Sequence, residues 1–407
     1  CSVCDEILLA QEEIAALGHT EEVVPGKAAT CTETGLKDGK KCSVCGETLV
    51  AQEEIPALGH TEEVVAGKDA TCTETGLTEG KKCSVCGETL VAQEEISALG
   101  HAYGEASYVW SDDNSVCTAT KICANDPSHV VTENATVISI KVQASAEKVI
   151  YTYNVEFADS DFAAQSKIVE GAISIENKIA TVNAPAIAGR VASHDYVKFS
   201  FHNAEATHEF TIYYSEIDVW DGTSVSESLA GSGTLEDPYL IQSAADLKLI
   251  ADTVNALAAK TSAYSGMYFK MTKSIDLGGA KNFHIGTKSS WGERQIFGGY
   301  LDGNNCTIRG LDNSLALFGC VEGGWIKNLS VYGNVKATVA SNGALIGYLF
   351  NAEIHNITNY ATVEGAGNVG GIVGNMQQSA NNTSSNLVNY GNVPDSSTKV
   401  GGIAGLI

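Results

Sequence analysis

"KNLSVYGNV" occupies residues 327–335, and "HNITNYATV" at 355–363 and "SNLVNYGNV" at 385–393 align with it without gaps. Each segment alternates polar residues with Leu, Ile or Val, which is the pattern of a half-buried strand. Asn recurs at the second position, and the glycine-rich segments "NGALIG", "NVGGIVG" and "KVGGIAG" follow the three strands in turn. A coil-sized period of short strands, Asn corners and Gly turns predicts a parallel β-helix.

One strong helix pattern precedes these repeats. Ser243 is a candidate N-cap, and Asp246 stands three residues later, as in a capping box. A helix over residues 243–259 would cap the first coil, whose strand edges would otherwise be unpaired. Its apolar face is formed by Leu247, Ile250, Val254 and Leu257.

The C-terminal part resembles GLUG-type surface repeats over residues 231–407. The motifs that carry the resemblance are "GSGTLEDPYLIQSAADLKLIAD", "YSGMYFKMTKSIDLGG", "IFGGYLDGNNCTIRGL" and "NVGGIVG". The resemblance implies a secreted, adhesin-like role at the cell surface and leaves the ligand open. Asp302 and Asn304 are expected to form a turn, and Cys306 and Cys320 to point inward as small apolar residues.

A second repeat family fills the first quarter of the chain with a period of 41 residues. "KKCSVCGETLVAQEEI" at 40–55 recurs unchanged at 81–96, and a diverged copy opens the chain. A fixed period indicates one structural unit copied in tandem. The residues that keep the period are Cys1, Cys42 and Cys83, then Cys4, Cys45 and Cys86, then Cys31 and Cys72, and finally His19, His60 and His101.

Each complete repeat offers three Cys and one His, a set that can complete a tetrahedral zinc shell. A unit of 41 residues buries little core, so some staple is expected. The sequence predicts structural zinc, and disulfides are the alternative, although pairing within a repeat leaves one thiol over. The predicted ligand sets are Cys31, Cys42, Cys45 and His60 in one repeat, and Cys72, Cys83, Cys86 and His101 in the next.

Ownership of the His is open, because each His could serve the Cys that follow it or those that precede it. We favour the downstream His of the same repeat, which leaves Cys1, Cys4 and His19 as an incomplete shell. Four protein ligands leave no open position for a catalytic water. Short strands separated by Gly-rich turns give the unit a zinc-ribbon-like outline.

These units resemble the Cys-rich repeats of large surface proteins from anaerobic Firmicutes. The matching stretch is "ATCTETGLKDGKKCSVCGETLVAQEEIPALGH" at 29–60, with its copy at 70–101. The resemblance implies a spacer or interaction module without catalytic activity.

The segment "YVWSDDNSVCTATKICANDPSH" at 108–129 breaks the period. Cys117, Cys123 and His129 could be half a metal site, with Glu133 as a weak further candidate, or Cys117 and Cys123 could form a disulfide. Trp110 is expected in a core. Alternating β-branched and aromatic residues over 138–212 predict one or two small antiparallel β modules.

The fold expected from these patterns is mostly β. Tandem Cys/His repeats at 1–101 precede β modules at 102–220, a linker at 221–242, and a capping helix with a truncated β-helix at 243–407. Because the chain begins and ends inside repeats, we expect it to be a fragment.

Charge and motif content narrow the function. Residues 1–101 hold 7 basic and 19 acidic residues, which disfavours nucleic acid and anionic membrane surfaces as partners. No apolar run is long enough to span a membrane. In 231–407 the arginines are Arg294 and Arg309, and the acidic residues are scattered, which disfavours a β-helix enzyme acting on acidic polysaccharide.

The sequence therefore predicts a non-enzymatic, extracellular fragment of a cell-surface or cell-wall protein. Zinc-stapled spacers would carry a β-helix that binds glycans or surface proteins. A carbohydrate-active enzyme, a region of a larger surface hydrolase, and passive packing without a ligand are the alternatives.

Overall fold

The computed structural model describes residues 3, 12–203, 205–290, 293–338, 340–377, 381–394 and 399–406. The expected fold class is confirmed, since about 50% of the residues lie in strands and 3% in a helix. The chain divides into two compact units. One comprises residues 1–105 and 121–131, and the other comprises residues 106–120 and 132–407.

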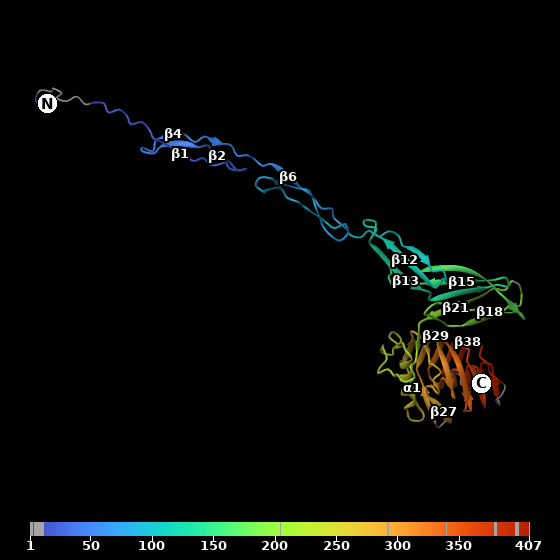
Figure 1. Ribbon diagram of the computed structural model, residues 1–407. Coiled ribbons are helices and arrows are strands. Elements are labelled where there is room, and N and C mark those ends of the chain that lie inside the picture. The colour runs from blue at the N-terminus through green and yellow to red at the C-terminus, as the bar shows by residue number, and fades with distance from the viewer. Residues whose placement is uncertain are drawn as a thin grey trace. The chain divides into compact units, whose positions relative to one another are not determined.

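The C-terminal part is a parallel β-solenoid of about six turns (Figure 1). Its strands form two long sheets, ordered β22-β26-β29-β31-β34-β38 and β24-β28-β30-β33-β37-β40, and a short sheet, β32-β36-β39. The elements are β22 (Ile217–Val219), β23 (Tyr239–Ile241), α1 (Ala244–Asn255), β24 (Thr261–Ala263), β25 (Tyr268–Met271), β26 (Ser274–Asp276), β27 (Thr287–Ser290), β28 (Glu293–Phe297), β29 (Tyr300–Asn313), β30 (Phe318–Glu322), β31 (Trp325–Ala337), β32 (Ser341–Asn342), β33 (Ile346–Phe350), β34 (Glu353–Asn359), β35 (Thr362–Gly365), β36 (Asn368–Gly370), β37 (Val373–Met376), β38 (Thr383–Asn389), β39 (Lys399–Gly401) and β40 (Ala404–Leu406).

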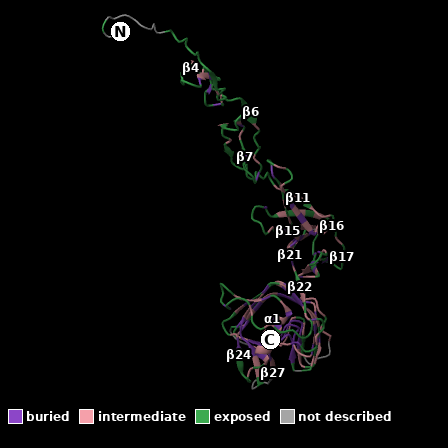
Figure 2. Ribbon diagram, turned by 60° about the vertical axis from the view of Figure 1, so that its left-hand side comes forward, coloured by how far each residue is buried: buried purple, intermediate pink, exposed green. Residues whose placement is uncertain are grey.

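Successive coils place like residues on like residues. Leu329 pairs with Ile357, which pairs with Leu387 on the next coil. Leu329 and Ile357 are at most 1% exposed, and Figure 2 shows buried residues concentrated inside the coils. Cys306 pairs with Leu329 and is buried, as is Cys320, so both point inward as expected. Apolar rows that run from coil to coil therefore form the core.

Asparagines form a hydrogen-bonded ladder at one corner of the coils. Asn328, Asn356 and Asn386 have φ of 57°, 54° and 51°, the left-handed region that Asn tolerates better than most residues. Asn386 donates to Asn356, Asn356 to Asn328, and Asn328 to Asp302, each over 2.8 Å. Asp302 also accepts from the Asn304 N–H, which confirms the expected turn.

Helix α1 covers the start of the solenoid. Ser243 and Asp246 form the expected capping box. The helix ends at Asn255 and not at 259, because the Asn255 side chain turns to the coil and bonds the His284 carbonyl and the Gly286 N–H. Its buried apolar residues in the solenoid core are Ala244, Leu247, Ile250, Ala251 and Val254.

The β module before the solenoid packs three antiparallel sheets, β16-β15-β14-β21-β19, β17-β18-β20 and β11-β12-β13, around one core. Ile140, Tyr153, Phe199 and Ile212 are buried there, and Trp110 packs against the same core, as expected. The strands are β11 (Ser107–Trp110), β12 (Val116–Ile122), β13 (Val130–Thr136), β14 (Ser139–Ala144), β15 (Lys148–Val155), β16 (Gln165–Ala172), β17 (Ile175–Glu176), β18 (Ile179–Asn183), β19 (Val191–Ala192), β20 (Tyr196–Ser200) and β21 (His208–Ser215).

A tyrosine column on the solenoid holds this module. Tyr332 and Tyr360 stack with ring centroids 4.5 Å apart, and Tyr360 and Tyr390 are 5.2 Å apart. Each hydroxyl meets the backbone at or beside β20. The three contacts are Asp195 N–H to Tyr332, Tyr360 to the Tyr196 carbonyl, and Lys198 N–H to Tyr390.

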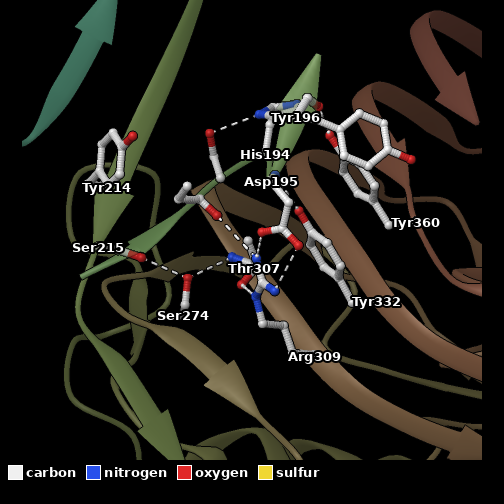
Figure 3. Close-up of polar contacts among 12 residues, drawn as sticks. His194, Asp195, Tyr196, Tyr214, Ser215, Ser274, Thr307, Arg309, Tyr332 and Tyr360 are labelled. Atoms are coloured by element: carbon white, nitrogen blue, oxygen red, sulfur yellow. Dashed lines mark hydrogen bonds and ion pairs between the residues drawn. The ribbon is translucent and has the colours of Figure 1, made fainter. Parts of the chain in front are cut away.

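An ion pair and a buried histidine complete this interface (Figure 3). Arg309 bonds Asp195 over 2.6 Å and lies 3.8 Å from the Tyr332 ring centroid. His194 Nε2 lies 3.1 Å from Thr358 Oγ1. Burial lowers the pKa of His194 to about 4, so the ring is neutral in the fold at neutral pH.

The N-terminal repeats have two short sheets each, β1-β3-β4 with β2-β5, and β6-β8-β9 with β7-β10. Between residues 12 and 101, the buried apolar side chains of the described residues are four cysteines, Cys31, Cys42, Cys72 and Cys83. The strands are β1 (Glu21–Val24), β2 (Gly35–Leu36), β3 (Gly39–Cys42), β4 (Thr48–Val50), β5 (Glu54–Ile55), β6 (Glu62–Val65), β7 (Gly76–Leu77), β8 (Gly80–Cys83), β9 (Thr89–Val91) and β10 (Glu95–Ile96).

A substitution at Gly370 tests how closely successive coils stack. A Cβ there would lie 2.0 Å from the Val373 carbonyl oxygen and 2.7 Å from Ala404 Cα, both of which are backbone atoms. Gly370→Ala should therefore lower the free energy of unfolding by about 2–4 kcal/mol. Gly402→Ala is the control, because a Cβ at Gly402 meets nothing within 4 Å. Equal urea midpoints for the two variants would contradict this account of the stacking.

The neutral His194 makes stability depend on pH. Its pKa is lower in the fold than its unfolded value near 6.5, so the unfolded chain binds the extra proton between these values. The contribution is complete above about pH 6.5 and is lost as pH falls toward 4. Between pH 7.5 and 5, the wild type should lose about 2 kcal/mol more stability than His194→Gln. Urea melts at both pH values measure this, with His202→Gln, at an exposed position, as the control.

Candidate metal centres

The Cys-x2-Cys stretches at residues 42–45 and 83–86 each form a tight knuckle between two strands. The Cys42 N–H donates to the Glu47 carbonyl, and the Gly46 N–H donates to the Cys42 carbonyl, each over 2.8 Å. Gly46 has φ of +75°, and Gly87 has +79° in the next copy. These glycines supply the turn that the sequence predicts after each knuckle.

The remaining Cys and the His of a repeat meet at a different place. Cys31 lies near the tip of the hairpin formed by β1 and β3, whereas Cys42 pairs with Glu21 at the base. The Leu58 N–H donates to the Thr30 carbonyl, and the Gly59 N–H donates to the Cys31 carbonyl. His60 is therefore brought next to Cys31 and away from the knuckle of its own repeat.

This geometry groups candidate ligands from neighbouring repeats, whereas the predicted sets lay within one repeat. Cys31 and His60 meet the knuckle of the next repeat, Cys83 and Cys86, with all four donor atoms within 4.8 Å of one another. The Cys31 and Cys83 Sγ atoms are 3.7 Å apart, and Cys86 Sγ lies 3.5 Å from His60 Nδ1. The donors predicted to group within one repeat are not brought together, because the hairpin separates its tip from its base.

The preceding knuckle has the same arrangement. Cys42 and Cys45 gather with His19, and Cys45 Sγ lies 3.6 Å from His19 Nδ1. The structure thus places His19 and His60 beside Cys that follow them in the sequence, as in the alternative assignment and not in the favoured one. Cys1 and Cys4 lie outside the described residues.

The donor distances fit a tetrahedral zinc ion. With Zn–S near 2.3 Å and Zn–N near 2.05 Å, tetrahedral ligands lie about 3.8 Å apart for two sulfurs and about 3.6 Å for sulfur and nitrogen. The S–S and S–N separations in these groups match those values, whereas the two sulfurs of a disulfide lie about 2.05 Å apart. Three thiols and an imidazole are also the donors that zinc prefers.

Neighbouring carboxylates orient the histidines. His19 Nε2 lies 3.5 Å from Glu47, and His60 Nε2 lies 3.5 Å from Glu88. A carboxylate on the far ring nitrogen leaves the near nitrogen to face the metal. The glutamates recur with the same 41-residue period as the knuckles, so the repeat itself marks them in the sequence.

The knuckles favour thiolates. The N–H of Cys86 lowers the pKa of Cys83 to about 5, helped by His60 and other N–H groups and opposed by burial. In the preceding knuckle, the N–H groups of Cys45 and Val44, together with His19, lower the pKa of Cys42 to about 6. The thiolate is the form that binds a metal.

Cys72 and His101 occupy the positions of Cys31 and His60, but the next repeat is missing there. They lie instead beside His129 and Cys123. Cys117 does not join this group, because it belongs to the β-module core. Cys117 and Cys123 are both free cysteines in the structure, and Cys123 lies beside Cys72. Glu133 accepts hydrogen bonds from the backbone of 158–159 and supplies no donor to this group.

Halomucin of Haloquadratum walsbyi is 28% identical to this chain over 284 residues, which is 62% of this chain and 3% of halomucin. The chain therefore spans a small part of the length of this curated relative. No known protein family matches the chain, and no solved structure matches it. Within the described ranges, no helix has both the length and the apolar character needed to cross a membrane.

Shared ligands between repeats can be tested by counting zinc. If the two residues bind one zinc ion, Cys31→Ser, Cys83→Ser and the double variant should each lose one equivalent in protein purified under reducing conditions. Ligands confined to single repeats would make the double variant lose two equivalents. Elemental analysis of the full chain gives the answer, and Ser43→Ala, at an exposed knuckle position without a metal donor, is the control.

Proposed function

We propose that this chain is part of a large extracellular protein with a structural, adhesin-like role at the cell surface or cell wall. The repeats act as zinc-clamped spacers, and the solenoid presents a non-catalytic binding surface. The similarity to a short part of halomucin supports such a role, as do the resemblances to GLUG-type repeats and to Cys-rich repeats of Firmicutes surface proteins.

The spacer role rests on what the repeats bury. Their buried apolar side chains, among the described residues, are cysteines, while Val44, Leu58 and Val85 are at least 67% exposed. The ion pairs Lys40–Glu21 and Lys81–Glu62 are exposed, and such pairs contribute little stability. A metal that joins one hairpin tip to the next knuckle would supply the missing cohesion.

Pulling the full chain by its ends tests the spacer. The clamp between Cys31 and Cys86 shields the intervening residues from extension. Its rupture should release about 20 nm of chain, at up to ~3.6 Å per residue. Extension steps of this length should appear in the force traces with zinc and be absent after zinc is removed by a chelator. Identical force traces in both conditions would refute the zinc clamp.

The binding surface proposed for the solenoid is a groove of about 430 Å³ between the Asn ladder and strand β21 of the β module. Asn328, Asn356 and Thr211 supply amides and a hydroxyl, and Tyr213 supplies an aromatic ring that is 42% exposed. Amides, hydroxyls and an aromatic face suit a glycan. Among the described residues that line the groove, none is Asp or Glu, which favours binding over acid–base hydrolysis.

A glycan array probed with the full chain tests this surface. Tyr213→Ala should weaken binding of any positive glycan about tenfold, the equivalent of ~1.4 kcal/mol. The control is Ile179→Ala, which changes a residue of similar exposure on strand β18. Absence of any glycan signal, or an equal loss in both variants, would contradict the proposed groove.

A further inference from the structure

The loop that follows strand β12 contains a degenerate knuckle. Cys123 is followed three residues later by Asp126, where a repeat has its second Cys. Burial raises the pKa of the Cys123 thiol, but His101 and the N–H groups of Ala102, Asp126 and Asn125 lower it to about 6. The N–H groups of Cys86 and Val85 likewise lower the pKa of Cys83. The match in backbone groups indicates a knuckle-like turn at residues 123–126 that has Asp126 at the position of the second Cys.

The preceding repeat meets this loop as it would meet another repeat. The Leu99 and Gly100 N–H groups bond the Thr71 and Cys72 carbonyls, as in the repeat before. Cys72 Sγ lies 3.7 Å from Cys123 Sγ, the separation also found between Cys31 and Cys83. Cys72, His101 and His129 have donor atoms that lie within 4.8 Å of one another. Cys123 therefore adds a second thiol beside a group of three donors, without the second knuckle Cys.

His129 is positioned to supply the fourth donor atom. The Cys123 N–H donates to the His129 carbonyl, and the His129 N–H donates to the Asp126 carbonyl, each over 3.0 Å. The imidazole lies against His101, with ring centroids 4.9 Å apart. His129 Nδ1 is buried and has no hydrogen-bond partner among the described residues, while Nε2 lies 3.8 Å from Asp126 Oδ2. A buried, unpaired ring nitrogen is unfavourable unless it binds something.

We propose that Cys72, His101, Cys123 and His129 form a Cys2His2 zinc site, with Asp126 as the carboxylate that orients His129. The proposal rests on the zinc-clamp function and extends it from the junctions between repeats to the loop between β12 and β13. Asp126 stands at the sequence position of the second knuckle Cys but does not bind the metal. It orients His129, as Glu47 and Glu88 orient the histidines of the repeats.

The two kinds of site differ in thiolate content. The site between repeats offers three sulfur donors, from Cys31, Cys83 and Cys86, whereas the proposed site offers two. Zinc binds more tightly where more soft thiolates surround it. A chelator should therefore remove zinc from the Cys2His2 site first and from the Cys3His site at higher concentration.

The experiment uses the full chain, purified under reducing conditions and loaded with zinc. His129→Ala should lose one zinc equivalent, and the exposed control His202→Ala should lose none. Asp126→Asn should keep the equivalent but bind it about 10- to 100-fold more weakly. A full zinc complement in His129→Ala, or a Cys72–Cys123 disulfide found by mass spectrometry in the zinc-loaded protein, would overturn the proposal.

Cobalt substitution keeps the test decisive if a variant folds poorly. In the Cys31→Ser/Cys83→Ser background, the remaining thiolate-to-cobalt absorption should fall when His129 is replaced by Ala and persist when His202 is replaced. Zinc lost on Cys31→Ser but not on His129→Ala would refute this site alone. Zinc lost on His129→Ala but not on Cys31→Ser would refute the clamp between repeats and leave this site standing.

Discussion

Coil-on-coil register is the constraint on which the solenoid depends. Leu329 rests on Ile357, and the same register brings each Asn amide within hydrogen-bond distance of the next and stacks Tyr332 on Tyr360. Because side chains alternate with period two, a slip by one residue would turn the buried row outward. It would break the Asn ladder and the tyrosine column at the same time, so three rows of side chains support one register.

The tyrosine column shows how a repeat can serve a second purpose. The ring of each stacked tyrosine packs on the ring of its neighbour. Its hydroxyl group remains at the outer surface of the solenoid, where it can form a hydrogen bond. The hydroxyls of Tyr332, Tyr360 and Tyr390 meet successive backbone groups of residues 195–198. The tyrosine column, which stabilises the coils, thus also fixes the β module. Arg309 adds an ion pair with Asp195 at the edge of the column.

The N-terminal repeats meet the same one-dimensional problem with different chemistry. Each unit contacts mainly its neighbours, as coils do, but its strands are too short and too exposed to bury an apolar row. The contact between units is made by Cys and His donors instead. Cys31 at one hairpin tip meets Cys83 in the next knuckle, so the repeat period becomes the spacing of the candidate metal centres.

Local pattern was sufficient for much of this protein. Period-two apolar residues, Asn corners and Gly turns determine the strands and the solenoid, and Ser243 with Asp246 determines the start of α1, because these preferences act over a few residues. The 41-residue period likewise identified the Cys and His of the repeats as a set. Which Cys and His meet could only be decided by tertiary structure, since antiparallel pairing in the hairpin carries Cys31 away from Cys42. Cys123 and His129 became visible as partners of Cys72 and His101 only in space, because Asp126 replaces the second Cys of the knuckle and leaves no Cys-x2-Cys signal in the sequence.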